Sequence, residues 1–215
     1  MRTYVLAEGH GEVRAVPNLL SRLAPSLGPF AVTRVPGMAN EAALLRHCEL
    51  FRARGDAHAL LAMRDDADGC PKVDAPALAT ALRAKNLPFQ AAIVLAYREY
   101  ESLFLPCIDE MAGRPLEMPG HPPRSGLKAG TRYEGDFEAR RGVKEWLSGN
   151  MTEGHRYKPT LDQLAFTRMV DFDKVRASGL PWFASLERAL AFLVAHSGES
   201  AAAYPLEVSG GRPRP

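Results

Sequence analysis

Short apolar runs alternate with longer amphipathic segments over residues 1–111 of the chain. The apolar runs predict strands at 3–7, 30–35, 58–64 and 90–97. Between these runs, apolar residues recur at helical spacing, which predicts helices at 12–23, 40–54 and 74–85 and a further helix that begins near Glu99. Strands that alternate with helices are typical of a parallel sheet flanked by helices. The sequence therefore predicts an α/β core.

The pattern changes after Met111. Residues 112–141 are rich in Pro, Gly and basic side chains, which predicts a long loop. Helical spacing returns over 142–196 and predicts a helical extension packed on the core, with short helices near 143–149, 160–169, 171–178 and 184–195. Small residues, Gly and Pro dominate 197–215, which we expect to be a flexible tail.

Composition narrows the class of protein. A chain of 215 residues that is 46% hydrophobic can fill one principal core. The formal net charge of +2 does not indicate general binding to nucleic acid, so any basic surface must be local. Cys48, Cys70 and Cys107 have neither disulfide-framework nor zinc-site spacing, and they favour a cytoplasmic protein. No apolar run approaches the roughly 20 residues that span a bilayer, so we expect no membrane partner.

Acidic residues stand where three of the predicted strands end. Glu8 follows the first strand, an Asp-rich turn follows the third, and two glutamates follow the fourth. Because parallel strands share one carboxyl edge, we expect these carboxylates to converge in one crevice. Carboxylate oxygens beside open space suit Mg²⁺ or Mn²⁺, which we expect as the cofactor. The candidate metal ligands are Glu8, Asp65, Asp66, Asp68, Glu99 and Glu101.

Each of these acids also has an ordinary structural interpretation. Glu8 would be an exposed turn residue, and Asp68 with the following glycine would form a solvated turn. Glu99 and Glu101 would be favoured by a helix dipole without any metal, and Glu12 is interpreted as an acid of the first helical turn. Both interpretations stay open at this point.

The metal interpretation assigns catalytic roles. Phosphodiester cleavage requires neutralised phosphoryl oxygens and an activated water. Asp66 and Asp68 would hold the cation, with Asp65 as the alternative to Asp66, and Glu8 would be a further ligand or the general base. The catalytic candidates are therefore Glu8, Asp66 and Asp68.

Basic residues of the loop and of the helical extension are candidates for contact with a nucleic-acid backbone. They are Arg124, Lys128, Arg132, Arg140, Arg141 and Lys144. Tyr133, Trp146 and Tyr157 would be available to stack on bases. Mixed-charge, solvated surface is the commoner explanation of such a pattern.

Several segments together resemble a known family. They are Leu6-Ala7-Glu8-Gly9, residues 65–71, residues 98–105, residues 143–147, and residues 157–160 with Gln163. This arrangement resembles the TOPRIM fold of topoisomerases, primases and old-type nucleases. It is more closely similar to a bacterial TOPRIM-like family of unknown function that includes the RloB and abortive-infection proteins, often encoded beside ATPases.

The resemblance implies a TOPRIM-like parallel sheet and a metal-dependent, nuclease-type enzyme that cleaves phosphodiesters. It also implies a role in antiphage defence beside an ATPase partner. The chain departs from the pattern at Ser102 and Leu103, where relatives carry a small residue and Trp. Either Asp65 or Asp66 can occupy the leading position of the acidic turn.

Two further functions stay open. Asp66-Ala67-Asp68-Gly69 is similar to the nucleophile turn of haloacid-dehalogenase-type phosphatases, in which Asp66 would attack phosphate and Asp68 would protonate the leaving group. That motif normally follows the first strand of its fold, whereas about sixty residues precede it here. The other possibility is a non-catalytic binding or regulatory subunit of an ATPase complex.

Overall fold

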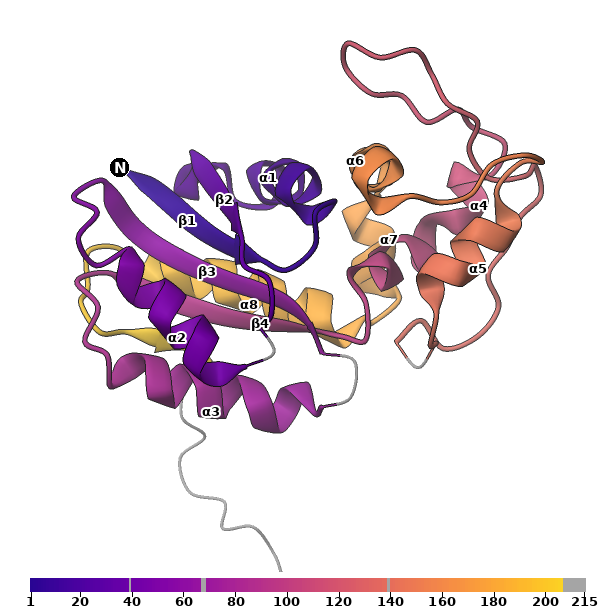
Figure 1. Ribbon diagram of the computed structural model, residues 1–215. Coiled ribbons are helices and arrows are strands. Elements are labelled where there is room, and N and C mark those ends of the chain that lie inside the picture. Colours follow the sequence, from indigo (N-terminus) through magenta and orange to yellow (C-terminus); the bar gives the residue numbers. More distant parts are fainter. Residues whose placement is uncertain (39, 67–68, 139, 207–215) are drawn as a thin grey trace, which may run out of the picture.

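The computed structural model describes residues 1–38, 40–66, 69–138 and 140–206 (Figure 1). All strands of its sheet run parallel, in the order β2-β1-β3-β4-β5. Their bounds are β1 Arg2–Ala7, β2 Phe30–Arg34, β3 Ala57–Asp66, β4 Gln90–Tyr97 and β5 Ala203–Tyr204. The α/β class, the parallel sheet and the positions of β1 to β4 confirm the sequence-based prediction.

The strand order produces a doubly wound sheet. The chain leaves β1 for β2 on one side and returns to β3 on the other side of β1. The register pairs Val5 with Val32 of β2 and with Leu61 of β3, so β1 is bonded along both of its edges. In such sheets the carboxyl ends of the two strands at the reversal point flank the usual ligand crevice. Here those strands are β1 and β3.

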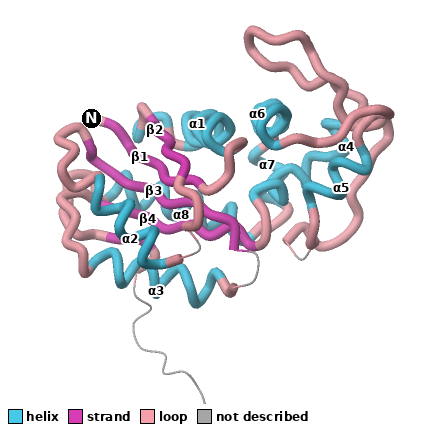
Figure 2. The backbone as a smooth tube through the Cα atoms, viewed as in Figure 1, coloured by secondary structure: helices cyan, strands magenta, loops and turns pink. Residues whose placement is uncertain are grey.

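Two layers of helices cover the sheet (Figure 2). α1 (Glu12–Leu23) and α8 (Pro181–Ala195) lie on one face, and α2 (Glu41–Leu50) and α3 (Pro71–Arg83) lie on the other. Alternate strand residues supply the two cores, because successive side chains point to opposite faces. Val5 and Leu61 pack toward α1 and α8, whereas Leu6 and Leu60 pack toward α2 and α3. This double burial explains why the strands are continuous apolar runs.

A helical region lies beyond the carboxyl ends of the strands, on the right of Figure 1. It contains a 3₁₀ helix, η2 (Tyr100–Cys107), then α4 (Ile108–Met111), α5 (Val143–Asn150), α6 (Pro159–Met169) and α7 (Phe172–Ala177). A second 3₁₀ helix, η1 (Pro25–Leu27), lies outside this region and directly follows α1. The α-helix expected from Glu99 is therefore mostly 3₁₀. Pro106 within η2 has no backbone N–H for an α-helical hydrogen bond.

η2 joins the helical region to the sheet layer. Leu103 and Phe104 are fully buried in it, and Phe104 stacks on Phe166 of α6 with 5.3 Å between ring centroids. The indole N–H of Trp182, at the start of α8, donates a 2.8 Å hydrogen bond to the Ser102 hydroxyl. One continuous core thus extends from the sheet into the extension.

The loop predicted at 112–141 contains no helix or strand among its described residues. Two isolated antiparallel bridges, Leu116 with Arg124 and Leu127 with Met151, fasten it to itself and to the end of α5. Part of the loop extends away from the helices in Figure 1.

The tail differs from the expectation of frayed chain. Ala203 pairs in parallel with Ala91 of β4, and this short strand, β5, lengthens the sheet. The Arg83 guanidinium of α3 donates to the carbonyl oxygens of Ala203 and Pro205 at 2.8 and 3.0 Å. Residues 207–215 lie outside the described residues.

Candidate functional site

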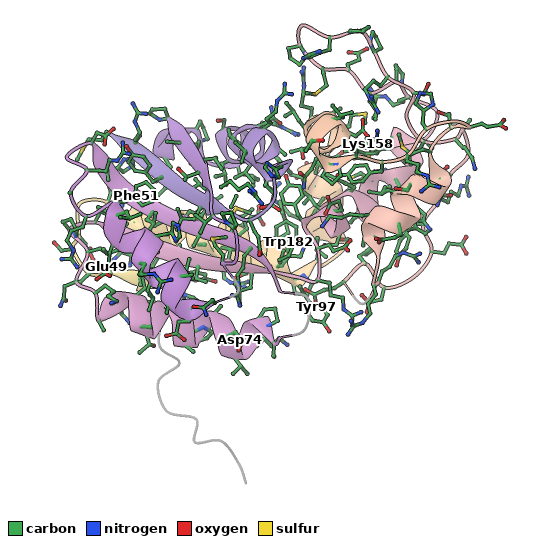
Figure 3. The ribbon with its side chains drawn as sticks, in the orientation of Figure 1. Glu49, Phe51, Asp74, Tyr97, Lys158 and Trp182 are labelled. Atoms are coloured by element: carbon green, nitrogen blue, oxygen red, sulfur yellow. The ribbon has the colours of Figure 1, made fainter. Side chains whose placement is uncertain are left out.

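The carboxyl ends of β1, β3 and β4 bring together the backbones of the predicted acidic segments. Glu8 directly follows β1, and Asp65 and Asp66 end β3 opposite Ala96 and Tyr97 of β4. Figure 3 labels Tyr97 at that end of β4. The side chain of Asp66 and all of Asp68 lie outside what the structure describes.

Lys144 of α5 forms ion pairs with two of the predicted ligands. Its ammonium nitrogen lies 3.3 Å from Oδ2 of Asp65 and 3.4 Å from Oε2 of Glu101. Burial lowers the Lys144 pKa, but Glu101 and Asp65 outweigh this effect, so its pKa is raised and the side chain stays charged. Removing one partner of a buried ion pair leaves an uncompensated charge, which is strongly destabilising.

Glu101 has no exposed side-chain surface. Its Oε1 accepts a 3.0 Å hydrogen bond from the Tyr157 hydroxyl. Burial, with a smaller contribution from Asp65, raises the Glu101 pKa to about 8 against the lowering effect of Lys144. Desolvation disfavours the charged carboxylate, so this group retains a proton more readily than a glutamate in water.

Asp65 is tied to the start of η2. Its Oδ1 accepts a 2.8 Å hydrogen bond from the backbone N–H of Tyr100. Burial raises the Asp65 pKa, and Lys144 lowers it. Both oxygens of Asp65 therefore have partners within the protein.

Glu12 belongs to the same cluster, which sequence reasoning missed by interpreting it as an ordinary helix acid. Its side chain is buried at the start of α1, and Oε2 accepts a 3.2 Å hydrogen bond from the backbone N–H of Glu8. Burial and, to a lesser extent, the nearby Asp65 raise the Glu12 pKa to about 7. A Cβ at Gly9 would lie 2.7 Å from Oε1 of Glu12, so a side chain there would displace the Glu12 carboxylate.

A small cavity of about 10 Å³ lies between Glu12, Asp65 and Tyr100. This volume is about that of one probe sphere, so the cavity has room for a single water. Asp65 thus lies between two further buried acids: it lines this cavity with Glu12, and it shares the Lys144 ammonium with Glu101.

Glu99 and Glu8 have different roles from these buried acids. Oε2 of Glu99 accepts a 3.1 Å hydrogen bond from the backbone N–H of Lys144 and so caps the start of α5. Glu8 is half-buried, and its carbonyl oxygen accepts a hydrogen bond from Nε of Arg34. Among the described residues, no hydrogen bond or ion pair reaches the Glu8 carboxylate.

Within the described ranges, no three His, Cys, Asp or Glu side chains form a group that could hold a metal ion. Asp65, Glu99 and Glu101 each have partners inside the protein. Of the predicted ligands whose side chains are described, Glu8 has a carboxylate without a hydrogen bond or ion pair to another described residue, while the side chains of Asp66 and Asp68 lie outside what the structure describes. Three carboxylates match the oxygen ligands that Mg²⁺ and Mn²⁺ prefer.

The basic residues predicted to bind nucleic acid do not share one role. Arg124 forms a 2.9 Å ion pair with the buried Asp162, and Lys144 belongs to the acidic cluster. Lys128 donates to a carbonyl oxygen of α5, and Arg140 lies over the ring of Trp146 at 5.5 Å. Two of the predicted residues, Arg132 and Arg141, are exposed.

Comparisons with protein-family models, with curated proteins and with solved structures find no match to this chain. No helix within the described residues is both long and apolar enough to cross a membrane.

Proposed function

We propose that the carboxyl edge between β1 and β3 is the active site of a metal-dependent, nuclease-type enzyme that cleaves phosphodiester bonds. The observation that supports this function is the strand order, because it makes β1 and β3 neighbours at the reversal point of a doubly wound sheet. Acidic residues end both strands, which is the position where such sheets bind their ligands.

The register supports the same arrangement. Leu6 of β1 lies opposite Ala62 of β3. By the same register, Glu8 follows its strand at the level of Arg64, immediately before the acidic end of β3 at Asp65 and Asp66. Because the Glu8 carboxylate has no partner among the described residues, it is available to a cation or to a water.

The proposed ligand set is Glu8, Asp66 and Asp68. A divalent cation held there would neutralise phosphoryl oxygens and lower the pKa of a bound water. Glu8 binds the cation or accepts the proton of the attacking water. Lys144 holds Asp65 and Glu101 behind this edge, so these two acids position the segment and do not repel the substrate.

The test is incubation with labelled single- and double-stranded DNA and RNA in the presence of Mn²⁺. We expect cleavage by the wild type and a loss of at least about a hundredfold in Glu8→Gln and Asp68→Asn, the usual size for removal of a positioned acid or base. Glu117→Gln, which changes an exposed acid of the loop, is the matched control and should cleave normally. Equal cleavage by all proteins would indicate a contaminant and refute the proposal.

A second candidate is a non-catalytic binding or regulatory subunit, and Lys144 favours it. This lysine already supplies a cation to Asp65 and Glu101, as expected if an acidic edge had lost its metal. Calorimetry with Mg²⁺ and Mn²⁺ distinguishes the two candidates. A heat of metal binding that Glu8→Gln abolishes supports the enzyme, whereas no heat of binding with either ion supports the subunit. An ATPase partner stays a prediction.

The phosphatase alternative makes a different prediction about Asp66. A covalent aspartyl phosphate at Asp66, trapped and located by mass spectrometry, would support that mechanism and exclude the nuclease. The motif follows β3, the third strand of the chain, and not the first.

A further inference from the structure

A hollow lies beside the acidic cluster, between α5 and the chain that enters α6. Its volume is about 610 Å³. This size falls within the range of about 300–1,000 Å³ typical of sites for small molecules and cofactors. The residues that shape its chemistry are Lys144, Glu145, Ser148, Arg156, Tyr157 and Lys158.

Cations outnumber acids around this hollow. Arg156 and Lys158 are exposed at its rim, and Figure 3 labels Lys158 where the chain enters α6. Within the described part of the chain, neither of these two side chains forms an ion pair or a hydrogen bond. Two like charges beside one hollow repel each other unless water or an anion compensates them.

The lining acid, Glu145, does not neutralise the rim. Its Oε2 would lie 3.0 Å from a Cβ at Gly142, so the carboxylate is turned back toward the start of α5. Asp162, the nearest buried acid of α6, accepts hydrogen bonds from Arg124 and from the backbone N–H of Lys158. Neither acid is paired with the Arg156 guanidinium or the Lys158 ammonium.

Tyr157 and Lys144, which form the inner wall of the hollow, are fixed by contacts with the buried acids. The Tyr157 hydroxyl donates to Glu101, and the Lys144 ammonium lies between Glu101 and Asp65. These contacts fix the Tyr157 ring and the Lys144 stem as wall, while Arg156 and Lys158 remain free to move onto a ligand. A rigid wall with unpaired cations at the mouth lowers the ordering cost of binding an anion.

We propose that this hollow is a binding site for a phosphate-bearing ligand, in which Arg156 and Lys158 bind the phosphoryl oxygens and Tyr157 lines the wall beside the rest of the ligand. Arg156 can form two parallel hydrogen bonds to one phosphoryl group, and Lys158 adds a point charge. The volume accommodates a mononucleotide. The same phosphomonoester chemistry is found in a free nucleotide and at the phosphorylated end of a nucleic-acid strand.

This site goes beyond the proposed cleavage and does not depend on it. Its test is calorimetry in EDTA, so that no divalent metal is present and cleavage cannot occur. The probes are inorganic phosphate, nucleoside 5′-monophosphates, and one oligonucleotide with and without a 5′-phosphate. A nuclease-inactive chain can still bind in this experiment, so failure of one proposal is distinguishable from failure of the other.

We expect at least one phosphomonoester probe to bind, and Arg156→Gln combined with Lys158→Gln to weaken its Kd at least about tenfold, which is 1.4 kcal/mol. Arg168→Gln removes an exposed cation of α6 outside the hollow and should leave Kd unchanged. Both variants alter exposed side chains, and thermal melting checks that they remain folded.

The probes then identify the source of the phosphate. Binding of mononucleotides supports a nucleotide site, and stronger binding of the oligonucleotide that carries the 5′-phosphate supports a strand-end site. The proposal is overturned if no phosphomonoester produces a heat, or if the Arg156/Lys158 double variant binds as tightly as the wild type.

Discussion

Lys144 and Glu101 form an ion pair of 3.4 Å in which the glutamate side chain is wholly shielded from solvent. The two residues come from α5 and η2, on opposite sides of the long loop. Their contact, together with the Lys144–Asp65 pair, binds the helical extension to the edge of the sheet.

Replacing Lys144 by Met should therefore destabilise the protein strongly. The change leaves Asp65 and Glu101 without their cation, and breaking one side of a buried pair costs about 3–5 kcal/mol. Urea denaturation measures the change in the free energy of unfolding. It is done at pH 8, where ionisation of the two acids makes the loss of their cation most costly. Lys174→Met breaks only exposed pairs with Asp109 and Glu110 and is the control with little expected effect. Equal stability of both variants would contradict a structural role for Lys144.

Glu12 should make the stability depend on pH. Its pKa is raised from 4.5 to about 7 in the folded chain, so the folded state binds this proton more tightly than the unfolded state. The stabilisation from this group is fully present below pH 4.5 and is lost as the pH rises toward 7. The upper limit of the loss is about 3 kcal/mol, at 1.36 kcal/mol per pKa unit.

Chemical denaturation from pH 4.5 to 8 checks this effect by comparing the wild type with Glu12→Gln. Relative to the wild type, the variant should gain stability as the pH rises, because it has no carboxyl to ionise. Two pH profiles that run parallel would show that Glu12 is not the titrating group.

Gly11 should not tolerate a side chain. A Cβ there would lie 2.0 Å from Oε1 of Gln163 and 2.6 Å from the carbonyl oxygen of Pro159, which would push α6 away from the turn before α1. We expect Gly11→Ala to cost about 1–3 kcal/mol by overpacking. Gly55→Ala meets nothing within 4 Å and should leave the melting temperature unchanged or slightly raised. Equal melting temperatures of the two variants would contradict close packing of Gly11 against α6.

Ser102→Ala should destabilise the junction between η2 and α8. The buried Trp182 indole N–H would lose its 2.8 Å acceptor, and an unsatisfied buried donor costs about 1–3 kcal/mol. Ser185→Ala removes only a 3.5 Å contact with Tyr204 and serves as the control. Urea denaturation followed by tryptophan fluorescence reports both changes, and similar midpoints for the two variants would argue against the Trp182 bond.

The strands were predictable for a physical reason. Each of β1, β3 and β4 is covered on both faces, so nearly every position is apolar and the run is visible in sequence. β5 was not predictable, because Ala203–Tyr204 is too short to display a period and depends on Arg83 and β4 for its hydrogen bonds. η2 has apolar spacing like that of a helix, and Pro106 is the residue that argues for a tighter turn.

The sequence correctly predicted that the acids lie at the carboxyl edge of the sheet, but it did not predict their partners. Strand ends alone locate Glu8 and Asp65 together. The pairing of Lys144 with Asp65 and Glu101 depends on the path of the long loop, which brings α5 back beside η2. No local sequence pattern reveals this path. The burial of Glu12 likewise has no local signature, because an acid in the first turn of a helix is ordinarily exposed.

The short strand β5 has a practical consequence for how the protein is handled. It occupies one side of the start of β4, and Arg83 holds the chain there through the carbonyl groups of Ala203 and Pro205. Trimming the C-terminus back to α8 would uncover strand backbone that can recruit another molecule, with oligomers or precipitate as the result. Truncations and affinity tags are better placed after Leu206.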